Sequence, residues 1–300
     1  MEIGVVGLGK MGLNLALNLL DHSHDVFGFD TYDAARANAA AVDVAVKGSL
    51  DDLLDSFSGK KICWLMLPAG DITGAVVDEL VEKLSADDII IEAGNSNYKD
   101  SVRRAEKAQQ KGIHYLDVGT SGGMSGARNN ACLMIGGNES AFKGMEDVFA
   151  EISITDGYLY AGGSGSGHYL KMVHNGIEYG MMQAIGEGFQ LVKESKYDFN
   201  LADVAKVWDN GSVIRGWLME LSESAFRKDA DLSSIKGVVA ASGEAKWTVE
   251  EALELGVPAP IITLSLMMRN YTQEEDSFSA KVVASLRNEF GGHQVVPVEE

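Results

Sequence analysis

The first half of the chain alternates short apolar runs with longer stretches in which apolar residues recur at helical spacing. The predicted strands are 3–6, 25–29, 42–46, 62–67, 89–92, 115–118, 132–135 and 152–154, and the predicted helices between them are 11–20, 49–56, 71–84, 99–111 and 139–150. Fully apolar strands that alternate with amphipathic helices are typical of a parallel sheet covered by helices on both faces. We therefore predict an α/β fold with a doubly wound parallel sheet.

From about residue 165 the strand pattern disappears and only helical periodicity remains. The predicted helices are 167–196, 200–209, 213–228, 244–255, 260–272 and 274–289. Gly256–Pro260 and Gly291–Pro297 interrupt the pattern, as glycine and proline commonly do. A length of 300 residues accommodates two domains. We predict a sheet domain over residues 1–164 and an all-α C-terminal domain over residues 165–300.

The first predicted strand runs directly into a glycine-rich loop that opens a helix. This loop, Gly7-Leu8-Gly9-Lys10-Met11-Gly12, has the GxGxxG spacing that binds the pyrophosphate of dinucleotides. Its glycines allow a tight turn and close approach of the backbone to phosphate, and the helix N-terminus supplies N–H groups. A second predicted strand ends on Asp30, where the fingerprint requires an acid to bind a ribose hydroxyl. Together these features predict a Rossmann-type domain.

Asp30 also bears on the choice of cofactor. A carboxylate at this position accepts hydrogen bonds from the ribose hydroxyls and repels a 2′-phosphate by like charge. The next residues, Thr31 and Tyr32, provide no arginine that would neutralise such a phosphate. The sequence therefore predicts NAD as the cofactor, with NADP less favoured.

Three further loops follow predicted strands, at the edge where open parallel sheets bind ligands. Leu67-Pro68-Ala69-Gly70 follows one strand, and Glu92–Asn97, which contains Asn95, follows the next. The third loop contains Ser121-Gly122-Gly123, whose backbone N–H groups suit a carboxylate. Ordinary turn chemistry is the alternative explanation for glycine-rich loops. We predict that these loops bind cofactor and substrate.

The helix predicted from residue 167 carries four polar residues with helical spacing. Lys171, His174, Asn175 and Glu178 fall on one face, and Lys171 and Glu178 would lie about 10 Å apart along it, which leaves room for a small polyol. The apolar residues around this set are Tyr169, Leu170, Met172, Val173 and Ile177. A helix so apolar should be buried, and a buried lysine or glutamate must be paired or functional. We therefore interpret this face as functional rather than as a solvated surface.

The charge and composition restrict the possible partners. A net charge of −19 argues against binding of nucleic acid or of anionic lipid, and an anionic substrate would need a local basic pocket. No apolar run is long enough to span a membrane, and the N-terminus does not resemble a signal peptide. Cys63 and Cys132 lie in apolar strand-like runs and are predicted to be core thiols. A reducing cytoplasmic location is expected.

In these motifs the chain resembles the decarboxylating 6-phosphogluconate dehydrogenases. The most specific matches are Gly94–Ser96, Ser121–Gly123, Gly167–Tyr179, Lys246–Thr248 and Arg287–His293. The resemblance covers most of the chain, which is similar to the short family members with a single helical domain. It implies oxidative decarboxylation of 6-phospho-D-gluconate to D-ribulose 5-phosphate, with the helical domain binding substrate and supporting oligomerisation.

The resemblance also implies roles for individual residues. Lys171 would be the base that removes the C3 hydroxyl proton, for which burial should lower its pKa. Glu178 would be the acid that protonates C1 of the enediol, and His174 and Asn175 would orient substrate hydroxyls. Asn95 would bridge cofactor and substrate. No metal is implied, because the C3 ketone itself accepts the electrons of decarboxylation.

The remaining implied roles concern the two acidic groups of the substrate. Ser121, Gly122 and Gly123 would hold the C1 carboxylate. Tyr179, Arg269, Arg287 and His293 would bind the phosphate. In the family the last two come from a neighbouring subunit's tail, which implies a homodimer or homotetramer with shared active sites.

The chain departs from the long family members at two relevant positions. Asp30-Thr31 stands where those members carry asparagine and arginine, which favours NAD, and Ser242 stands where they carry a phosphate-binding lysine.

Two rival functions remain open. A non-decarboxylating β-hydroxyacid dehydrogenase, such as a 3-hydroxyisobutyrate dehydrogenase, would share the fingerprint, the Ser-Gly-Gly loop and a helix lysine. A catalytically idle NAD(H)-binding sensor would tolerate loss of Lys171 or Glu178, and both are present.

Overall fold

A computed structural model describes residues 1–297 of the chain. The chain divides into two compact units, Met1–Gly176 and Ile177 onward. The domain boundary predicted from the sequence, between residues 164 and 165, lies ahead of the long helix in which this division falls. Each unit is described separately below.

The first unit is built on one eight-stranded sheet with the order β3-β2-β1-β4-β5-β6-β7-β8. The strands are β1 (Glu2–Val6), β2 (Asp25–Phe29), β3 (Ala45–Val46), β4 (Ile62–Leu65), β5 (Ile89–Glu92), β6 (His114–Ser121), β7 (Ala131–Gly137) and β8 (Ser153–Gly162). The order of β3 to β6 is that of a doubly wound dinucleotide-binding sheet, so the predicted fold class is confirmed.

The pairing of β6 with β7 is antiparallel, whereas the sequence predicted a parallel sheet throughout. Only residues 122–130 connect the two strands, which is fewer than the dozen or more that a parallel crossover needs. The glycine-rich segment of this connection forms a short helix, α6 (Gly123–Asn129), that the periodicity did not reveal. The sheet is therefore mostly parallel, with one reversal after the Ser-Gly-Gly loop.

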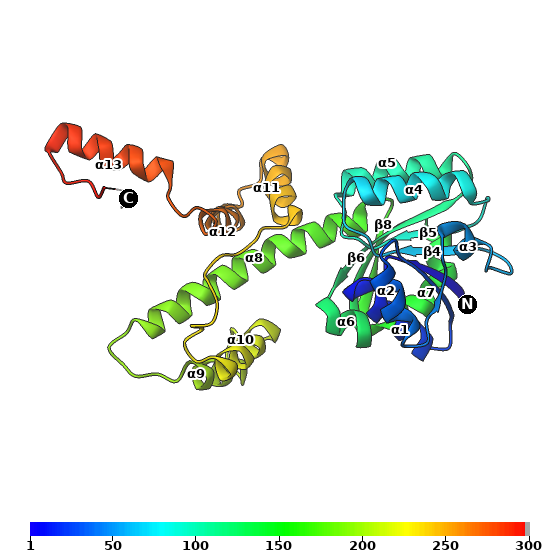
Figure 1. Cartoon of the computed structure of the whole chain (residues 1–300), viewed down its shortest axis with the longest axis horizontal. Coiled ribbons are helices and arrows are strands. Elements are labelled where there is room, and N and C mark those ends of the chain that lie inside the picture. The colour runs from blue at the N-terminus through cyan, green and yellow to red at the C-terminus, as the bar shows by residue number, and fades with distance from the viewer. Residues whose placement is uncertain (298–300) are drawn as a thin grey trace. The chain divides into compact units, whose positions relative to one another are not determined.

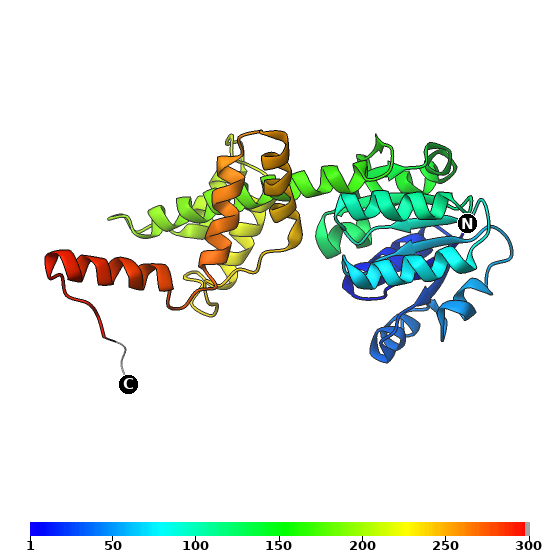
Figure 2. The same cartoon turned by 90° about the horizontal axis from the view of Figure 1, so that it is seen from above.

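Helices cover both faces of the sheet (Figure 1). They are α1 (Lys10–Asp21), α2 (Asp33–Ala40), α3 (Leu50–Leu54), α4 (Asp71–Lys83), α5 (Tyr98–Gln109) and α7 (Glu139–Ile152). Trp64 of β4 packs in one core with residues of α1 and α7, whereas its neighbour Cys63 packs in the other core with residues of α4 and α5. Figure 2 shows α4 and α5 running along one face. Alternate residues of each buried strand thus supply two cores, which explains its uninterrupted apolar sequence.

The second unit is helical, as the sequence predicted. Helix α8 (Ser166–Lys193) enters it from the first unit, and the others are α9 (Leu201–Asp209), α10 (Trp217–Lys228), α11 (Gly243–Leu255), α12 (Pro260–Tyr271) and α13 (Phe278–Gly291). Phe189 of α8 packs with Leu201 of α9 and Phe226 of α10 in a small apolar core. Helix α13 has no buried residue within this chain.

Several local predictions were wrong. Residues 42–44 are not strand, and Val42 is exposed in the turn after α2, a helix that the alanine-rich segment did not reveal. Leu170 and Ile177 of α8 are 37% and 52% exposed, so the helix is less enclosed than its composition suggested. Cys132, the second residue of β7, is exposed, whereas Cys63 is buried as predicted.

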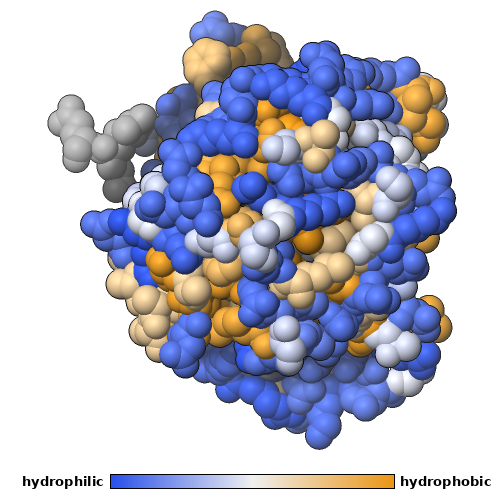
Figure 3. Space-filling model, turned by 90° about the vertical axis from the view of Figure 1, so that its right-hand side faces the viewer, coloured by the Kyte–Doolittle hydropathy of each residue, from blue (hydrophilic) through white to orange (hydrophobic). Residues whose placement is uncertain are grey.

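Asp and Glu number 44 in the chain, against 25 Lys and Arg. Hydrophilic residues predominate on the face shown in Figure 3, with smaller hydrophobic groups between them. Among the helices of residues 1–297, none combines the length and the apolar character that crossing a bilayer requires.

Candidate active site

The GxGxxG loop lies between β1 and β4, where the strand order reverses. A Cβ atom added to Gly12 would lie 1.8 Å from the Gly7 carbonyl oxygen, and one added to Gly7, whose φ is +94°, would lie 2.5 Å from that of Met66. Gly9 is the N-cap of α1 and provides no side-chain cap. Positions 7 and 12 therefore require glycine. The N–H groups at the start of α1 suit a pyrophosphate. The residues present therefore fit a dinucleotide.

Asp30, at the end of β2, is held directly beside this loop. Its carboxylate accepts hydrogen bonds from the backbone N–H of Leu8 at 2.7 Å and of Tyr32 at 2.8 Å. The guanidinium of Arg36 on α2 donates to the Asp30 carbonyl oxygen at 2.6 Å and pairs with Asp33. Sequence reasoning found no arginine near Asp30 because it missed α2, which brings position 36 back to the strand end.

The loops after β4 and β5 are in backbone contact. A Cβ atom on Gly94 would lie 2.2 Å from the Leu67 carbonyl oxygen, so only glycine permits this approach. Asn95 has a φ of +54°, and its side-chain oxygen accepts a hydrogen bond from the Thr120 backbone N–H at 3.1 Å. The predicted cofactor loop 67–70 and the predicted bridging residue Asn95 therefore lie at one edge of the sheet.

The first part of α8 packs against β6 and brings Lys171 to the same edge. A Cβ atom on Gly119 would lie 2.3 Å from the Lys171 Cβ, so the helix and the strand are as close as a glycine allows. Lys171 is 5% exposed, and its ammonium donates to the Asn175 side-chain oxygen at 2.7 Å. His174 Nδ1 lies 2.9 Å from the same oxygen, and its Nε2 lies 3.3 Å from the Ser121 hydroxyl. Four predicted site residues thus form one chain of contacts.

The Ser-Gly-Gly loop adopts a conformation that requires its glycines. Gly122 has a φ of +110° and Gly123 a φ of +58°, both in the left-handed region. Gly122 is the N-cap of α6, so backbone N–H groups at the helix start lie next to Ser121. This geometry fits the expected binding of a carboxylate.

Asp117 is a functional candidate that sequence reasoning missed. This fully buried carboxylate of β6 accepts hydrogen bonds from the backbone N–H of Gly165 at 2.7 Å and of His168 at 2.9 Å. It therefore fixes the start of α8, one turn before Lys171. An acid within the otherwise apolar run 115–118 was the available signal, because buried carboxylates need partners.

In the second unit, Ser242 at the start of α11 and Arg269 of α12 both contact the side chain of Tyr179 on α8. The hydroxyl of Tyr179 lies 3.0 Å from that of Ser242 and accepts a hydrogen bond from the Ser242 backbone N–H at 2.8 Å. The guanidinium of Arg269 lies over the Tyr179 ring, 3.3 Å from its centroid. Tyr179 and Arg269, both predicted to bind phosphate, are therefore adjacent.

The other predicted residues of this unit lie apart from that group. Arg287 and His293 are both exposed at the end of α13, where the His293 N–H donates to the Arg287 carbonyl oxygen at 3.4 Å. Glu178 lies half-buried on α8, next to Tyr179 in sequence. Among residues 1–297, no group of three or more His, Cys, Asp or Glu side chains could hold a metal ion.

Two family models together match most of the chain. The NAD binding domain of 6-phosphogluconate dehydrogenase matches residues 2–162, and the C-terminal domain of 6-phosphogluconate dehydrogenase matches residues 167–290. The two matched ranges adjoin between the last strand of the sheet and helix α8.

Full-length relatives carry the same description. A Bacillus subtilis protein provisionally named a 6-phosphogluconate dehydrogenase is 52% identical over 293 residues, which are 98% of each chain. A Haloferax volcanii protein named an NAD(+)-dependent, decarboxylating 6-phosphogluconate dehydrogenase is 46% identical over 299 residues, again 98% of each. The solved 6-phosphogluconate dehydrogenase of Plasmodium falciparum superposes with a TM-score of 0.83 at 29% identity, over 100% of this chain and 67% of that one.

Proposed function

This chain belongs to the 6-phosphogluconate dehydrogenase family, and from that premise we propose that it converts 6-phospho-D-gluconate and NAD to D-ribulose 5-phosphate, CO₂ and NADH. The observation that supports this reaction most strongly is the chain of contacts from Lys171 through Asn175 and His174 to Ser121. It joins a buried amine to a loop suited to a carboxylate, so a sugar acid would have a base and a carboxylate anchor within one unit.

In this proposal Lys171 acts as general base toward the C3 hydroxyl. Burial disfavours the ammonium form, and the amine must be neutral to accept the proton. Asn175 and His174 orient the amine and the substrate hydroxyls, and Ser121 with Gly122 and Gly123 holds the C1 carboxylate. The protonated Lys171 then stabilises the negative charge that develops on the C3 oxygen when CO₂ leaves.

Glu178 is the proposed acid of the last step. Loss of CO₂ leaves an enediol whose electrons are returned as a C–H bond, and this requires a proton at C1 of the product. A carboxylic acid in the next two turns of the Lys171 helix supplies it, and the product ketone forms at C2.

NAD supplies the acceptor for the C3 hydride when it is bound. The residues that would hold it are Gly7, Leu8, Gly9, Lys10, Met11 and Gly12 around the pyrophosphate, Asp30 and Thr31 at the ribose, and Leu67, Pro68, Ala69 and Asn95 at the adjoining loops. The Asp30 carboxylate supports NAD over NADP, because it would repel a 2′-phosphate.

Phosphate recognition in this proposal falls to the second unit. Tyr179 and Arg269 are adjacent there, and Arg287 and His293 would come from the tail of a neighbouring subunit. Arg287 lies on a helix without buried side chains, His293 follows the end of that helix, and both are exposed, which supports a homodimer or homotetramer with shared sites. Residues 1–164 would then form the NAD-binding domain and residues 165–300 the substrate and oligomerisation domain.

The test is to follow reduction of NAD and of NADP spectroscopically with 6-phosphogluconate while trapping the released CO₂. NADH and CO₂ in equal amounts are the expected result. NADH without CO₂ would replace the proposal with a non-decarboxylating β-hydroxyacid dehydrogenase, to be assayed with 3-hydroxyisobutyrate. Tight NAD(H) binding without turnover of either acid would indicate a sensor.

A further inference from the structure

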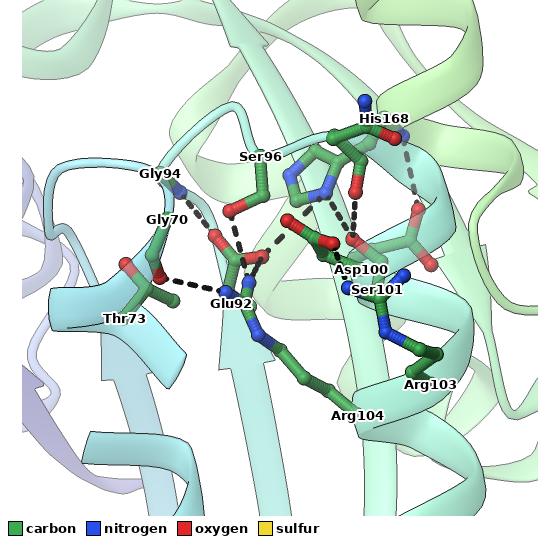
Figure 4. Close-up of polar contacts among 12 residues, drawn as sticks. Gly70, Thr73, Glu92, Gly94, Ser96, Asp100, Ser101, Arg103, Arg104 and His168 are labelled. Atoms are coloured by element: carbon green, nitrogen blue, oxygen red, sulfur yellow. Dashed lines mark hydrogen bonds and ion pairs between the residues drawn. The ribbon is translucent and has the colours of Figure 1, made fainter. Parts of the chain in front are cut away.

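A buried cluster of charged and polar side chains lies beneath the strand-end loops of the first unit (Figure 4). At its centre is Glu92, which ends β5 and is fully buried. One carboxylate oxygen accepts a hydrogen bond from the Gly94 backbone N–H at 2.9 Å. The other lies 3.4 Å from Arg104, 3.4 Å from the Tyr115 hydroxyl and 3.6 Å from His168 Nδ1. This cluster joins β5, β6, α5 and the start of α8.

Arg104 of this cluster contacts residues of two strand-end loops. Its side chain is 11% exposed. One guanidinium nitrogen donates to the Ser96 hydroxyl at 3.1 Å and lies against Glu92, and the other donates to the Gly70 carbonyl oxygen at 2.9 Å. A single side chain from α5 therefore ties the end of the 67–70 loop to the 92–97 loop.

We propose that Arg104 is a positioning residue for the cofactor, which fixes the 67–70 loop against the loop that carries Asn95. The inference rests on the proposed function in one respect, namely that these loops bind NAD. Arg104 does not touch the reacting atoms. It acts through Gly70 on one loop and through Ser96, next to Asn95, on the other.

Fixing the two loops against each other requires an arginine rather than a lysine. A planar guanidinium presents several N–H groups in fixed directions, whereas a lysine ammonium is one compact group that cannot span Gly70, Ser96 and Glu92. Burial is the main cause that raises the pKa of Tyr115 well above its usual value, and the negative charge of Glu92 is the next. The phenol therefore stays protonated and donates to Glu92. The carboxylate is thus held by partners on several sides, and Arg104 is free to direct its second nitrogen to the loop.

The same loop has a second tether. The hydroxyl of Thr73, a fully buried residue of α4, donates to the Pro68 carbonyl oxygen at 2.7 Å. The loop backbone is therefore held at Pro68 by its own helix and at Gly70 by Arg104. The two tethers therefore restrain the loop backbone at two carbonyl groups, whether or not a cofactor is bound.

The experiment compares NADH affinity with stability in the full-length protein. Arg104→Lys should raise the Kd for NADH about tenfold, as expected for losing a charge-assisted hydrogen bond. The Kd is measured by fluorescence titration. The KM for NAD should rise with it, while the KM for 6-phosphogluconate at saturating NAD changes little. Arg103→Lys is the matched control, because Arg103 is the neighbour of Arg104 on α5, its side chain is 69% exposed, and it contacts Asp100 and the Lys99 carbonyl oxygen of the same helix.

Asp88→Asn separates positioning from general stability. Asp88 is buried at the opposite end of β5 and accepts hydrogen bonds from the Lys61 and Ser85 backbone N–H groups. The Asp88→Asn substitution should lower the Tm of the protein and leave the Kd for NADH unchanged. If Arg104→Lys lowers Tm in the same way without changing that Kd, Arg104 is only structural and the inference is wrong.

Thr73→Val provides a test that does not depend on how Arg104→Lys folds. This near-isosteric change removes the second tether, and it should also weaken NADH binding. An unchanged Kd would overturn the inference that the tethered conformation sets affinity. Failure of the proposed function is distinct, because the unsubstituted protein would then bind no NADH or turn over no 6-phosphogluconate.

Discussion

The Lys171 ammonium donates a hydrogen bond to the Asn175 side-chain oxygen 2.7 Å away, one turn further along α8. The same oxygen lies 2.9 Å from His174 Nδ1, so one amide carbonyl orients both the proposed base and a proposed substrate ligand. Because the two residues are at i and i+4 of one helix, their side chains lie on the same face one turn apart. The proposed base is therefore positioned before substrate binds.

Lys171→Met should abolish turnover of 6-phosphogluconate and leave NADH binding intact. Methionine preserves most of the side-chain volume against β6 but cannot accept a proton. The measurement is kcat together with the Kd for NADH. Lys111→Met, at a surface lysine paired with Glu82, is the control and should retain full activity. Appreciable residual oxidation by Lys171→Met would remove this residue as the base.

The second prediction concerns cofactor choice. Asp30→Ala should raise kcat/KM with NADP relative to NAD by about fivefold or more, because repulsion of about 1 kcal/mol or more between nearby like charges is removed. Steady-state kinetics with both cofactors measures the ratio, and an unchanged ratio would mean that Asp30 does not discriminate between them.

Arg36 sharpens this test. Its guanidinium already contacts the Asp30 carbonyl oxygen, so it would attract the 2′-phosphate once the carboxylate is gone. We expect Arg36→Met to cancel much of the gain when it is combined with Asp30→Ala. Arg103→Met, on α5, is the matched control and should leave that gain intact.

The fold was predictable because buried parallel strands and amphipathic helices leave different periodicities. Strand β5 (Ile89–Glu92) has the predicted bounds, since both of its faces are covered and the apolar run is uninterrupted. Helix α2 was not predictable, because Asp33–Ala40 is mostly alanine and shows little contrast between its faces. The direction of β7 was also missed, as it depends on the length of a connection and not on the strand itself.

The site was predictable where it depends on local sequence and not where it depends on packing. The spacing of Lys171, His174 and Asn175 placed them on one helical face, and their contacts are present. The links from Arg104 to Gly70 and from Asp117 to the start of α8 join segments far apart in sequence. Periodicity contains no information on such pairs, although an acid inside an apolar strand signals that a partner is needed.

The third prediction concerns the two thiols. Cys132 is exposed, whereas burial raises the pKa of Cys63 to about 12. A thiol-specific reagent near neutral pH should therefore modify Cys132 in the native protein and Cys63 only after unfolding. Cys132→Ser should eliminate the native reaction, and rapid modification of that variant would contradict the buried position of Cys63.

The raised pKa of Cys63 also has a consequence for stability. The folded protein favours the neutral thiol, whereas in the unfolded chain the thiol ionises near its ordinary pKa of 9.0. The contribution of this group to stability is therefore fully present below that pH and is lost as the pH rises toward about 12. Chemical denaturation of the Cys63→Ala variant and the unsubstituted protein across this range should show a smaller loss for the variant.

The last prediction concerns recognition of the phosphate. Arg269 lies over the ring of Tyr179, whose hydroxyl is fixed by Ser242, so this guanidinium is held in place although no lysine stands at position 242. Arg269→Met should reduce the preference for 6-phosphogluconate over gluconate, measured as the ratio of kcat/KM values, by at least about tenfold, the effect of losing one hydrogen bond to a charged group. Arg227→Met, at a surface arginine of α10 paired with Glu223, is the control. If Arg269→Met slows both substrates equally, Arg269 supports the helical unit without reading the phosphate.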